Sequence, residues 1–312
     1  RDVERSRGLG DVYKRQVRNR AHPLALGERC LLVQIEATHH AVLFTQNATH
    51  ALNKLARRVP LGPEDAVLIT QMEHHSNVLP WRQRGCEVIV AAVSKPDGAL
   101  DMEDLEAKLR AARGRVKVVS VSGGSNVTGV LPPLGRIARM AHESGALFAV
   151  DATQLLPHRK FEMGAPDDPE RIDFIAFSAH KMYAPFGAGA LVGLKEAFLE
   201  KDPDLVGGGT VNAVTMDQVL WAPLPEKEEA GTPNVLGCLA LGCGVTVLQN
   251  IGMDNVAEHE RELTRRALEK LCRLDGITLY GQNDPSLTTD RIGVITFNAH
   301  RFGHAHLAAI LG

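Results

Sequence analysis

The sequence predicts an α/β fold in which helices cover both faces of a largely parallel sheet. Two observations indicate this. From about residue 25 onward, short runs rich in β-branched residues alternate with segments of helical period. Strand, helix and strand also follow one another at the spacing of right-handed crossovers. A chain of 312 residues is long enough for two domains, or one domain with a large appendage, and for a core that needs no disulfide or metal.

Seven strands are predicted before residue 200, at residues 42–45, 66–70, 87–93, 117–121, 146–150, 173–178 and 189–192. Helices are predicted between several of them, at residues 48–58, 101–112 and 134–144. Asp101 can cap the second helix, with Asp104 at its third position. Pro132 and Pro133 precede the third helix and Gly145 follows it, which are usual start and stop signals.

The pattern changes near residue 200, where glycines 207–209 and the proline-containing residues 222–225 predict a long loop region. Helices at 235–250 and 254–274 and strands at 277–280 and 293–297 follow. We expect a large domain over residues 21–250 and the start of a smaller, truncated α+β C-terminal domain over residues 251–312. Residues 1–20 are expected to be disordered or non-native, and the apolar helix beginning at His304 suggests that the chain is a fragment.

Composition excludes several classes of protein. Lys plus Arg number 35 and Asp plus Glu 37, so the basic excess of a dedicated nucleic-acid or acidic-membrane binder is missing. No apolar run approaches the roughly 20 residues of a transmembrane helix. Five cysteines without a CxxC pair indicate free thiols in a reducing compartment, and we therefore expect a cytoplasmic protein.

Polar residues at the ends of predicted strands mark a candidate site. Ser178 ends the strand at 173–178, and His180 and Lys181 follow it directly; open α/β sheets bind ligands beyond the carboxyl ends of their strands. A lysine there could form a Schiff base, although a lone lysine is most often a surface residue. Asp151 ends the preceding strand and could pair with a protonated pyridine nitrogen, or simply cap a helix.

Two more strand ends add to this constellation. Residues 45–49 open a helix and offer amides and the Thr49 hydroxyl to an anion such as a phosphate. His74 and His75 follow the next strand; a histidine pair is more often a surface feature or a metal ligand, but no third ligand lies nearby. Lysine, carboxylate and anion site together are what pyridoxal 5'-phosphate (PLP) requires.

Six stretches carry a resemblance, in family order and at family spacing: residues 47–49, 72–77 with Pro80-Trp81, 125–129, 150–154, 178–181 and 229–234. On these stretches the sequence resembles the class V aminotransferase superfamily of fold-type I PLP enzymes, closest to the cysteine desulfurase and selenocysteine lyase branch. The resemblance covers residues 40 to 300 and implies a fold-type I, PLP-binding large domain.

The resemblance also implies a role for each matching residue. Lys181 would bind PLP covalently and transfer protons, Asp151 would pair with the ring nitrogen, and His74 would stack on the ring. The phosphate would be held by Ala48, Thr49, Ser178 and His180. Gln154 and Asn126 would lie near the phenolic oxygen, and Thr232 would reach the cofactor of a neighbouring subunit in a homodimer.

The implied reaction converts cysteine to alanine and leaves sulfur on an enzyme thiol, with a sulfur-acceptor protein as a further partner. Alternatives are another class V aminotransferase or amino-acid lyase, or an inactive fragment that keeps only the fold. None of the five cysteines matches the family's persulfide-forming position, so the chain as given is expected to be inactive. No metal site is expected, since His300, His304 and His306 lack partners at metal-ligand spacing.

Overall fold

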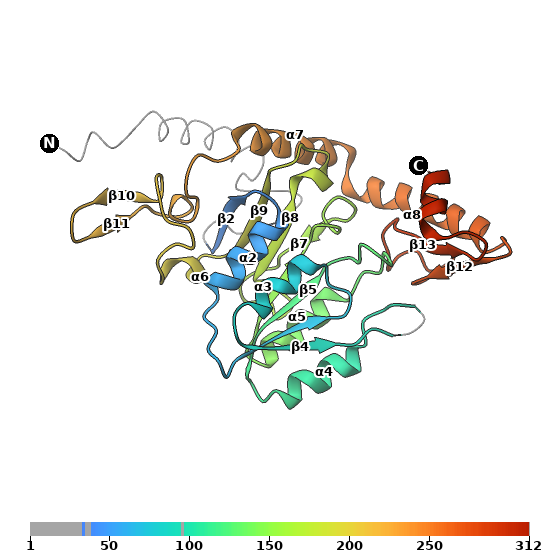
Figure 1. Ribbon diagram of the computed structural model, residues 1–312, viewed down its shortest axis with the longest axis horizontal. Helices are drawn as coiled ribbons and strands as arrows, with labels where there is room; N and C mark the ends of the chain where they lie inside the picture. The colour runs from blue at the N-terminus through green and yellow to red at the C-terminus, as the bar shows by residue number, and fades with distance from the viewer. Residues whose placement is uncertain (1–32, 35–38, 95–96, 312) are drawn as a thin grey trace.

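A seven-stranded sheet forms the centre of the molecule (Figure 1). The computed structural model describes residues 33–34, 39–94 and 97–311. Along the sheet the strands are β2 (His40–Thr45), β9 (Gly189–Leu194), β8 (Phe174–Ser178), β6 (Leu147–Asp151), β5 (Val116–Ser122), β3 (Ala66–Thr70) and β4 (Glu87–Ala91). Only β9 runs antiparallel to its neighbours, so the other six strands end at the same edge. The predicted α/β fold with a largely parallel sheet is confirmed.

Alternate residues of each strand pack on opposite faces of the sheet. On β8, Ile175 and Phe177 join a core with α4 (Met102–Ala111), α5 (Leu134–Glu143) and α7 (Val235–Ile251). Phe174 and Ala176 join the other core, with α2 (Ala48–Arg58), α3 (Leu79–Arg82) and α6 (Glu196–Leu199). Because both faces are covered, the strands are apolar along most of their length, which is why they could be predicted from the sequence.

In the described ranges, three small two-stranded sheets lie outside the central one. They are β1 (Val33–Gln34) with β7 (Phe161–Glu162), β10 (Val211–Val214) with β11 (Val219–Trp221), and β12 (Ile277–Tyr280) with β13 (Thr296–Ala299). The β10–β11 hairpin stands where a long loop is predicted, and this part of the prediction is wrong. Its short strands contribute nothing to either core, so no buried apolar run announced them.

Helix α7 ends at Gly252, whose φ of 86° lies in the left-handed region, and α8 (Met253–Leu271) leaves at a bend of 78°. This bend lies next to the predicted domain boundary, and the division into two domains stays a prediction. Strand β13 begins at Thr296, later than predicted, because the Val294 backbone pairs elsewhere: its amide donates to the Ile292 carbonyl, and its carbonyl accepts from the Arg291 guanidinium. Helix α9 (His304–Leu311), at the end of the described chain, has no buried residue.

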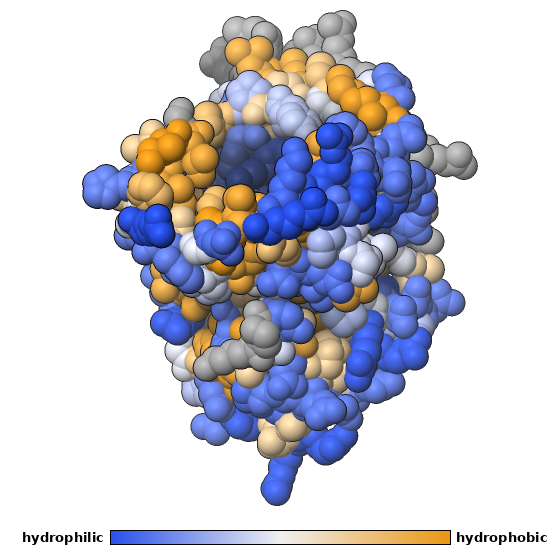
Figure 2. All heavy atoms as spheres, turned by 90° about the vertical axis from the view of Figure 1, so that its right-hand side faces the viewer, coloured by the Kyte–Doolittle hydropathy of each residue, from blue (hydrophilic) through white to orange (hydrophobic). Residues whose placement is uncertain are grey.

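Figure 2 views the molecule from the side that carries β12 and β13 and shows apolar groups interrupting a largely hydrophilic surface around a hollow. No single helix in the described ranges is long and apolar enough to cross a membrane, although the bent pair α7–α8 passes that test jointly on length and composition. The predicted disordered or non-native residues 1–20, and Cys30, lie outside the described residues.

Candidate active site

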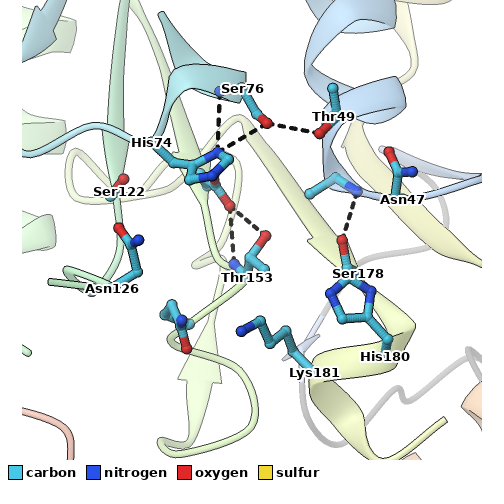
Figure 3. Close-up of a pocket in the computed structure, with 14 residues that line it drawn as sticks. Asn47, Thr49, His74, Ser76, Ser122, Asn126, Thr153, Ser178, His180 and Lys181 are labelled. Carbon is cyan, nitrogen blue, oxygen red and sulfur yellow. Dashed lines mark hydrogen bonds between the residues drawn. The ribbon is translucent and has the colours of Figure 1, made fainter. Parts of the chain in front are cut away.

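The ends of β2, β3, β5, β6 and β8 surround a pocket of about 240 Å³ (Figure 3). Nine of the ten predicted site residues line it: Ala48, Thr49, His74, Asn126, Asp151, Gln154, Ser178, His180 and Lys181. They come from segments up to 133 positions apart in the sequence, from Ala48 to Lys181. Parallel strands that end at one edge of a sheet bring such segments together, as expected.

One end of the pocket is formed by the start of α2. Asn47 caps this helix by accepting a hydrogen bond from the His50 amide over 2.9 Å. The Ala48 amide donates to Ser178 Oγ over 2.8 Å, which joins the start of α2 to the end of β8. Amides in the first turn of a helix have no acceptor inside the helix, and the helix dipole adds partial positive charge there. This end of the pocket is therefore suited to an anion.

His74 is fixed by a short hydrogen-bonded chain on its own loop. Its Nδ1 accepts from the Ser76 amide over 3.2 Å and lies 3.0 Å from Ser76 Oγ. Ser76 Oγ in turn lies 2.7 Å from Thr49 Oγ1 at the anion end of the pocket. Because an amide N–H can only donate, Nδ1 is the acceptor, and in the neutral ring Nε2 carries the proton.

Asp151 is the buried carboxylate of the site, with 6% of its surface exposed. Its Oδ1 accepts hydrogen bonds from the Thr153 hydroxyl over 2.5 Å and the Thr153 amide over 3.1 Å. Burial raises the pKa of Asp151, and the Thr153 hydrogen bonds oppose this rise without cancelling it. Both bonds end on Oδ1, and no hydrogen bond to Oδ2 is formed by the described residues. A buried carboxylate of this kind is stabilised by a nearby cation.

Lys181 lies on a short 3-10 helix, η2 (Ala179–Met182), directly after β8. Figure 3 shows its side chain extending into the pocket, with His74 on the far side of the space. It forms no ion pair or hydrogen bond with any other residue in the described ranges. Its amine is therefore available to a ligand.

Asn126 and Gln154 line the pocket from two loops. The Asn126 loop is folded by Ser125, whose Oγ accepts from the amides of Val127 (3.2 Å) and Thr128 (3.0 Å). It ends at Gly129, with φ of 75°; a Cβ there would lie 2.6 Å from the Val294 carbonyl oxygen. This close approach of the chain after residue 290 requires a glycine.

Thr232 is the tenth predicted residue, and the structure does not bring it to this pocket. It lies exposed after Gly231, between the β10–β11 region and α7. The prediction assigned Thr232 to the pocket of a neighbouring subunit, so its place here leaves that prediction untested.

Sequence reasoning missed five residues that line the pocket: Asn47, Ser76, Ser122, Gly124 and Thr153. Three of them stand within the motifs on which the resemblance rests, so their place was available from the sequence. Their roles could not be predicted from the sequence, because Ser76 and Thr153 act through hydrogen bonds that orient His74 and Asp151. The described part of the chain contains no group of three or more His, Cys, Asp or Glu residues that could hold a metal ion.

A family model supports the same interpretation. The model described as aminotransferase class-V matches residues 32–312. The chain belongs to the class-V aminotransferase family. Among curated members, it is 37% identical over 281 residues to a probable cysteine desulfurase of Halalkalibacterium halodurans, covering 86% of this chain and 65% of that protein. It is 39% identical over 280 residues to a cysteine desulfurase of Haloferax volcanii, covering 86% of this chain and 62% of that protein.

Solved structures of family members share the fold. A cysteine desulfurase from Thermococcus onnurineus matches with a TM-score of 0.79 at 28% identity, over 97% of this chain and 72% of its own. The cysteine desulfurase CsdA from Escherichia coli matches with a TM-score of 0.76 at 27% identity, over 97% of this chain and 71% of its own. The chain thus spans 62–65% of the length of these two curated relatives and 71–72% of the two solved chains.

Proposed function

We propose that the pocket binds PLP and that the chain supplies the cofactor site of an enzyme acting on an amino acid, with cysteine desulfuration as the reaction. The observation that carries the proposal is the meeting of Lys181 and Asp151, from the ends of neighbouring strands, in one pocket that has an anion site at the start of α2. The relatives named as cysteine desulfurases support the choice of reaction.

The donor set fits PLP at three separate points. The phosphate matches the end of the pocket formed by Ala48, Thr49, Ser178 and His180. The aldehyde carbon requires a free amine, which Lys181 offers. The pyridine nitrogen requires a buried carboxylate, and Asp151 accepts its hydrogen bonds from Thr153 on Oδ1 only. When bound, PLP acts as an electron sink for the bonds of the substrate Cα.

The residues around these three points would prepare the substrate Cα for proton transfer. Lys181 would hold the cofactor and then move a proton at Cα. Asp151 would keep the ring nitrogen protonated, since its buried charge is stabilised by a cation. His74 would lie against the ring face, and Asn126 and Gln154 would hydrogen-bond the phenolic oxygen.

Release of sulfur requires a thiol that accepts it. None of Cys86, Cys238, Cys243 and Cys272, the four cysteines in the described ranges, lines the pocket. We therefore propose the cofactor chemistry for this chain and assign the sulfur-accepting thiol to no residue of it.

The test is reduction with borohydride after addition of PLP, followed by digestion and mass spectrometry. We expect a single covalent adduct on Lys181. Lys181→Ala should abolish it, whereas the matched control Lys270→Ala, exposed on α8, should leave it unchanged. An adduct on another lysine in Lys181→Ala would contradict the assignment. With an added thiol such as dithiothreitol, which takes up the sulfur and reduces it to sulfide, formation of alanine and sulfide from cysteine would then support desulfuration over another amino-acid reaction.

We also propose that two copies form a homodimer in which Thr232 of one subunit reaches the cofactor of the other. Large apolar side chains are exposed on the segments that flank Thr232 in the sequence, with Met216 on the β10–β11 hairpin before it and Leu236 on α7 after it. A second copy of the chain would cover this apolar surface. A sulfur-acceptor protein and a cytoplasmic location stay predictions, since no contact in the structure bears on them.

Mixing two variants that each bind PLP weakly tests the dimer. A Lys181→Ala subunit keeps Thr232, and a Thr232→Ala subunit keeps Lys181. A mixed dimer therefore has one site with both residues, and tight PLP binding should reappear on mixing. Light scattering that shows a monomer at all concentrations would contradict the proposal.

A further inference from the structure

Glu73 directly precedes His74 in the sequence, and it does not line the pocket. Its Oε1 accepts from Thr70 Oγ1 over 2.6 Å; its Oε2 accepts from Asn77 Nδ2 over 2.6 Å and from Ser122 Oγ over 2.8 Å. Burial raises the pKa of Glu73 to about 7, against these hydrogen bonds. The chain thus keeps a desolvated carboxyl at this point. Desolvation costs free energy, which the three hydrogen bonds partly offset.

The donors around Glu73 are themselves held in place. The Asn77 Oδ1 accepts from Trp81 Nε1 over 3.1 Å and from Ser120 Oγ over 2.6 Å. Because the indole N–H can only donate, the orientation of the Asn77 amide is fixed, and its Nδ2 must face Glu73. Asn77, Trp81 and Ser120 are fully buried. Glu73 therefore accepts from a rigid group of donors.

Two of these hydrogen bonds attach the His74 loop to the neighbouring strand β5, from Ser122 to Glu73 and from Ser120 to Asn77. Between the end of β3 and α3 the loop contains only a three-residue 3-10 helix, η1 (His75–Asn77), so it has little structure of its own. Ser122 ends β5, lines the pocket, and pairs in register with Asp151 on β6. Glu73 thus joins the loop that carries His74 to the strand beside Asp151.

We propose that Glu73 is a positioning residue that holds the imidazole of His74 at its place in the pocket, because its carboxyl binds Asn77 within the His74 loop and joins that loop to Ser122 on β5. The inference rests on the proposed function, because it concerns how the chain binds PLP. Glu73 does not touch the cofactor itself, and it acts through the position of His74.

Two substitutions separate position from charge. In Glu73→Gln the amide oxygen can still accept from Asn77 and Ser122, while its NH₂ turns to Thr70 Oγ1, which can accept. The loop stays attached, and we expect PLP to bind within about threefold of the parent. Glu73→Ala removes all three hydrogen bonds, and we expect the dissociation constant of PLP to rise about tenfold or more.

The same substitutions in a His74→Ala background decide whether Glu73 acts through His74. If it does, Glu73→Ala weakens PLP binding less than about twofold when the imidazole is already absent. The dissociation constant is measured by equilibrium dialysis, and the absorbance maximum of bound PLP by spectroscopy. Asp173→Asn is the matched control: this buried carboxylate lies at the opposite end of the sheet, where it accepts from the Phe148 amide over 2.7 Å. It should lower thermal stability and leave PLP affinity unchanged.

A folded Glu73→Gln that binds PLP as weakly as Glu73→Ala would overturn the inference, because charge and not position would then matter. An equal loss from Glu73→Ala with and without His74 would also overturn it. Both results would leave the proposed function intact, provided that the unsubstituted chain binds PLP at Lys181. Failure of the unsubstituted chain to bind PLP would overturn the proposed function and this inference with it.

Discussion

The carboxyl edge of the central sheet and the β10–β11 hairpin distribute polar and apolar side chains in opposite ways. At the carboxyl edge, polar groups are buried: Asp151 is 6% exposed and Ser178 is 3% exposed. On the hairpin, large apolar groups are exposed, such as Val214 at 63% and Met216 at 98%. Burying polar groups and exposing large apolar groups both lower the stability of an isolated chain. We therefore expect each region to bind a ligand or a partner.

The two regions differ in what they are suited to bind. At the pocket, hydrogen bonds fix individual atoms, such as Oδ1 of Asp151 and Oγ of Ser178, which suits a small polar ligand. The hairpin offers side chains that few neighbours constrain, which suits a broad apolar contact with a second chain. Substitutions at the pocket should therefore change ligand binding strongly, and those on the hairpin should change the folded subunit little.

The largest effect should follow Asp151→Asn. The change keeps the shape and removes the charge that would hold the ring nitrogen protonated, so Cα proton exchange should slow about 10²–10³-fold. The measurement is exchange of the Cα hydrogen of cysteine or alanine for deuterium, by NMR, with PLP bound. This assay needs no sulfur-accepting thiol. Exchange at the parent rate would show that Asp151 does not tune the ring.

A large loss of stability should follow Gly129→Ala, at the contact between the Asn126 loop and the chain after residue 290. The added Cβ would lie 2.6 Å from the Val294 carbonyl oxygen, at a φ of 75°. We expect a loss of about 2–4 kcal/mol in the free energy of unfolding. Gly114→Ala is the control, since φ is 76° there but nothing lies within 4 Å of the Cβ. Equal losses in both would mean that the close approach to Val294 does not matter.

A smaller change in affinity should follow Ser178→Ala at the anion end of the pocket. The substitution removes a hydroxyl that would contact the phosphate and leaves the Ala48 amide without its acceptor. PLP binding should weaken by about 1–3 kcal/mol. Ser144→Ala, at the distant C-terminus of α5, should leave affinity unchanged. The prediction fails if the two variants bind PLP equally well.

The comparison also explains what could be predicted from the sequence. Strands such as Ala66–Thr70 and helix Ala48–Arg58 have the predicted bounds, because a buried apolar run or a capped periodic segment is a local signal. Asp151 and Lys181 were predicted to meet because both follow strands of one sheet. The hairpin was missed because β-strands outside a core lack that signal.

Hydrogen-bond partners inside the site were beyond prediction for a different reason. Glu73 and Ser122 are 49 positions apart, and their contact depends on the register between β3 and β5, which contains an irregularity at Ala66 and Val67. No local pattern specifies such a shift. The positions of site residues thus follow from strand order, whereas their orientation follows from the register.

The Glu73 carboxyl should also make stability depend on pH. Its pKa in the folded chain is about 7, above the ordinary value of 4.5, so the folded state binds more protons between these values than the unfolded state. Stability is therefore lost as pH rises through this window. Glu73→Gln should remove this loss. Its free energy of unfolding should therefore exceed that of the parent by about 1–3 kcal/mol more at pH 8 than at pH 5. Urea unfolding at both pH values measures it, with the exposed Glu64→Gln as control. A gain that is the same at both pH values would contradict the shift.

The smallest effect on the subunit is expected on the hairpin, and two methionines provide the comparison. Met163 is 1% exposed in the core beneath the sheet, and Met216 is 98% exposed at the tip between β10 and β11. Met163→Ala should cost about 2–5 kcal/mol in the free energy of unfolding, because it leaves a cavity. Met216→Ala should change it by less than about 0.5 kcal/mol at concentrations where the chain is monomeric.

At higher concentrations the same Met216→Ala should weaken self-association measured by sedimentation, because it removes apolar surface that a second copy would cover. Unchanged self-association would mean that the exposed hairpin tip lies outside the dimer contact.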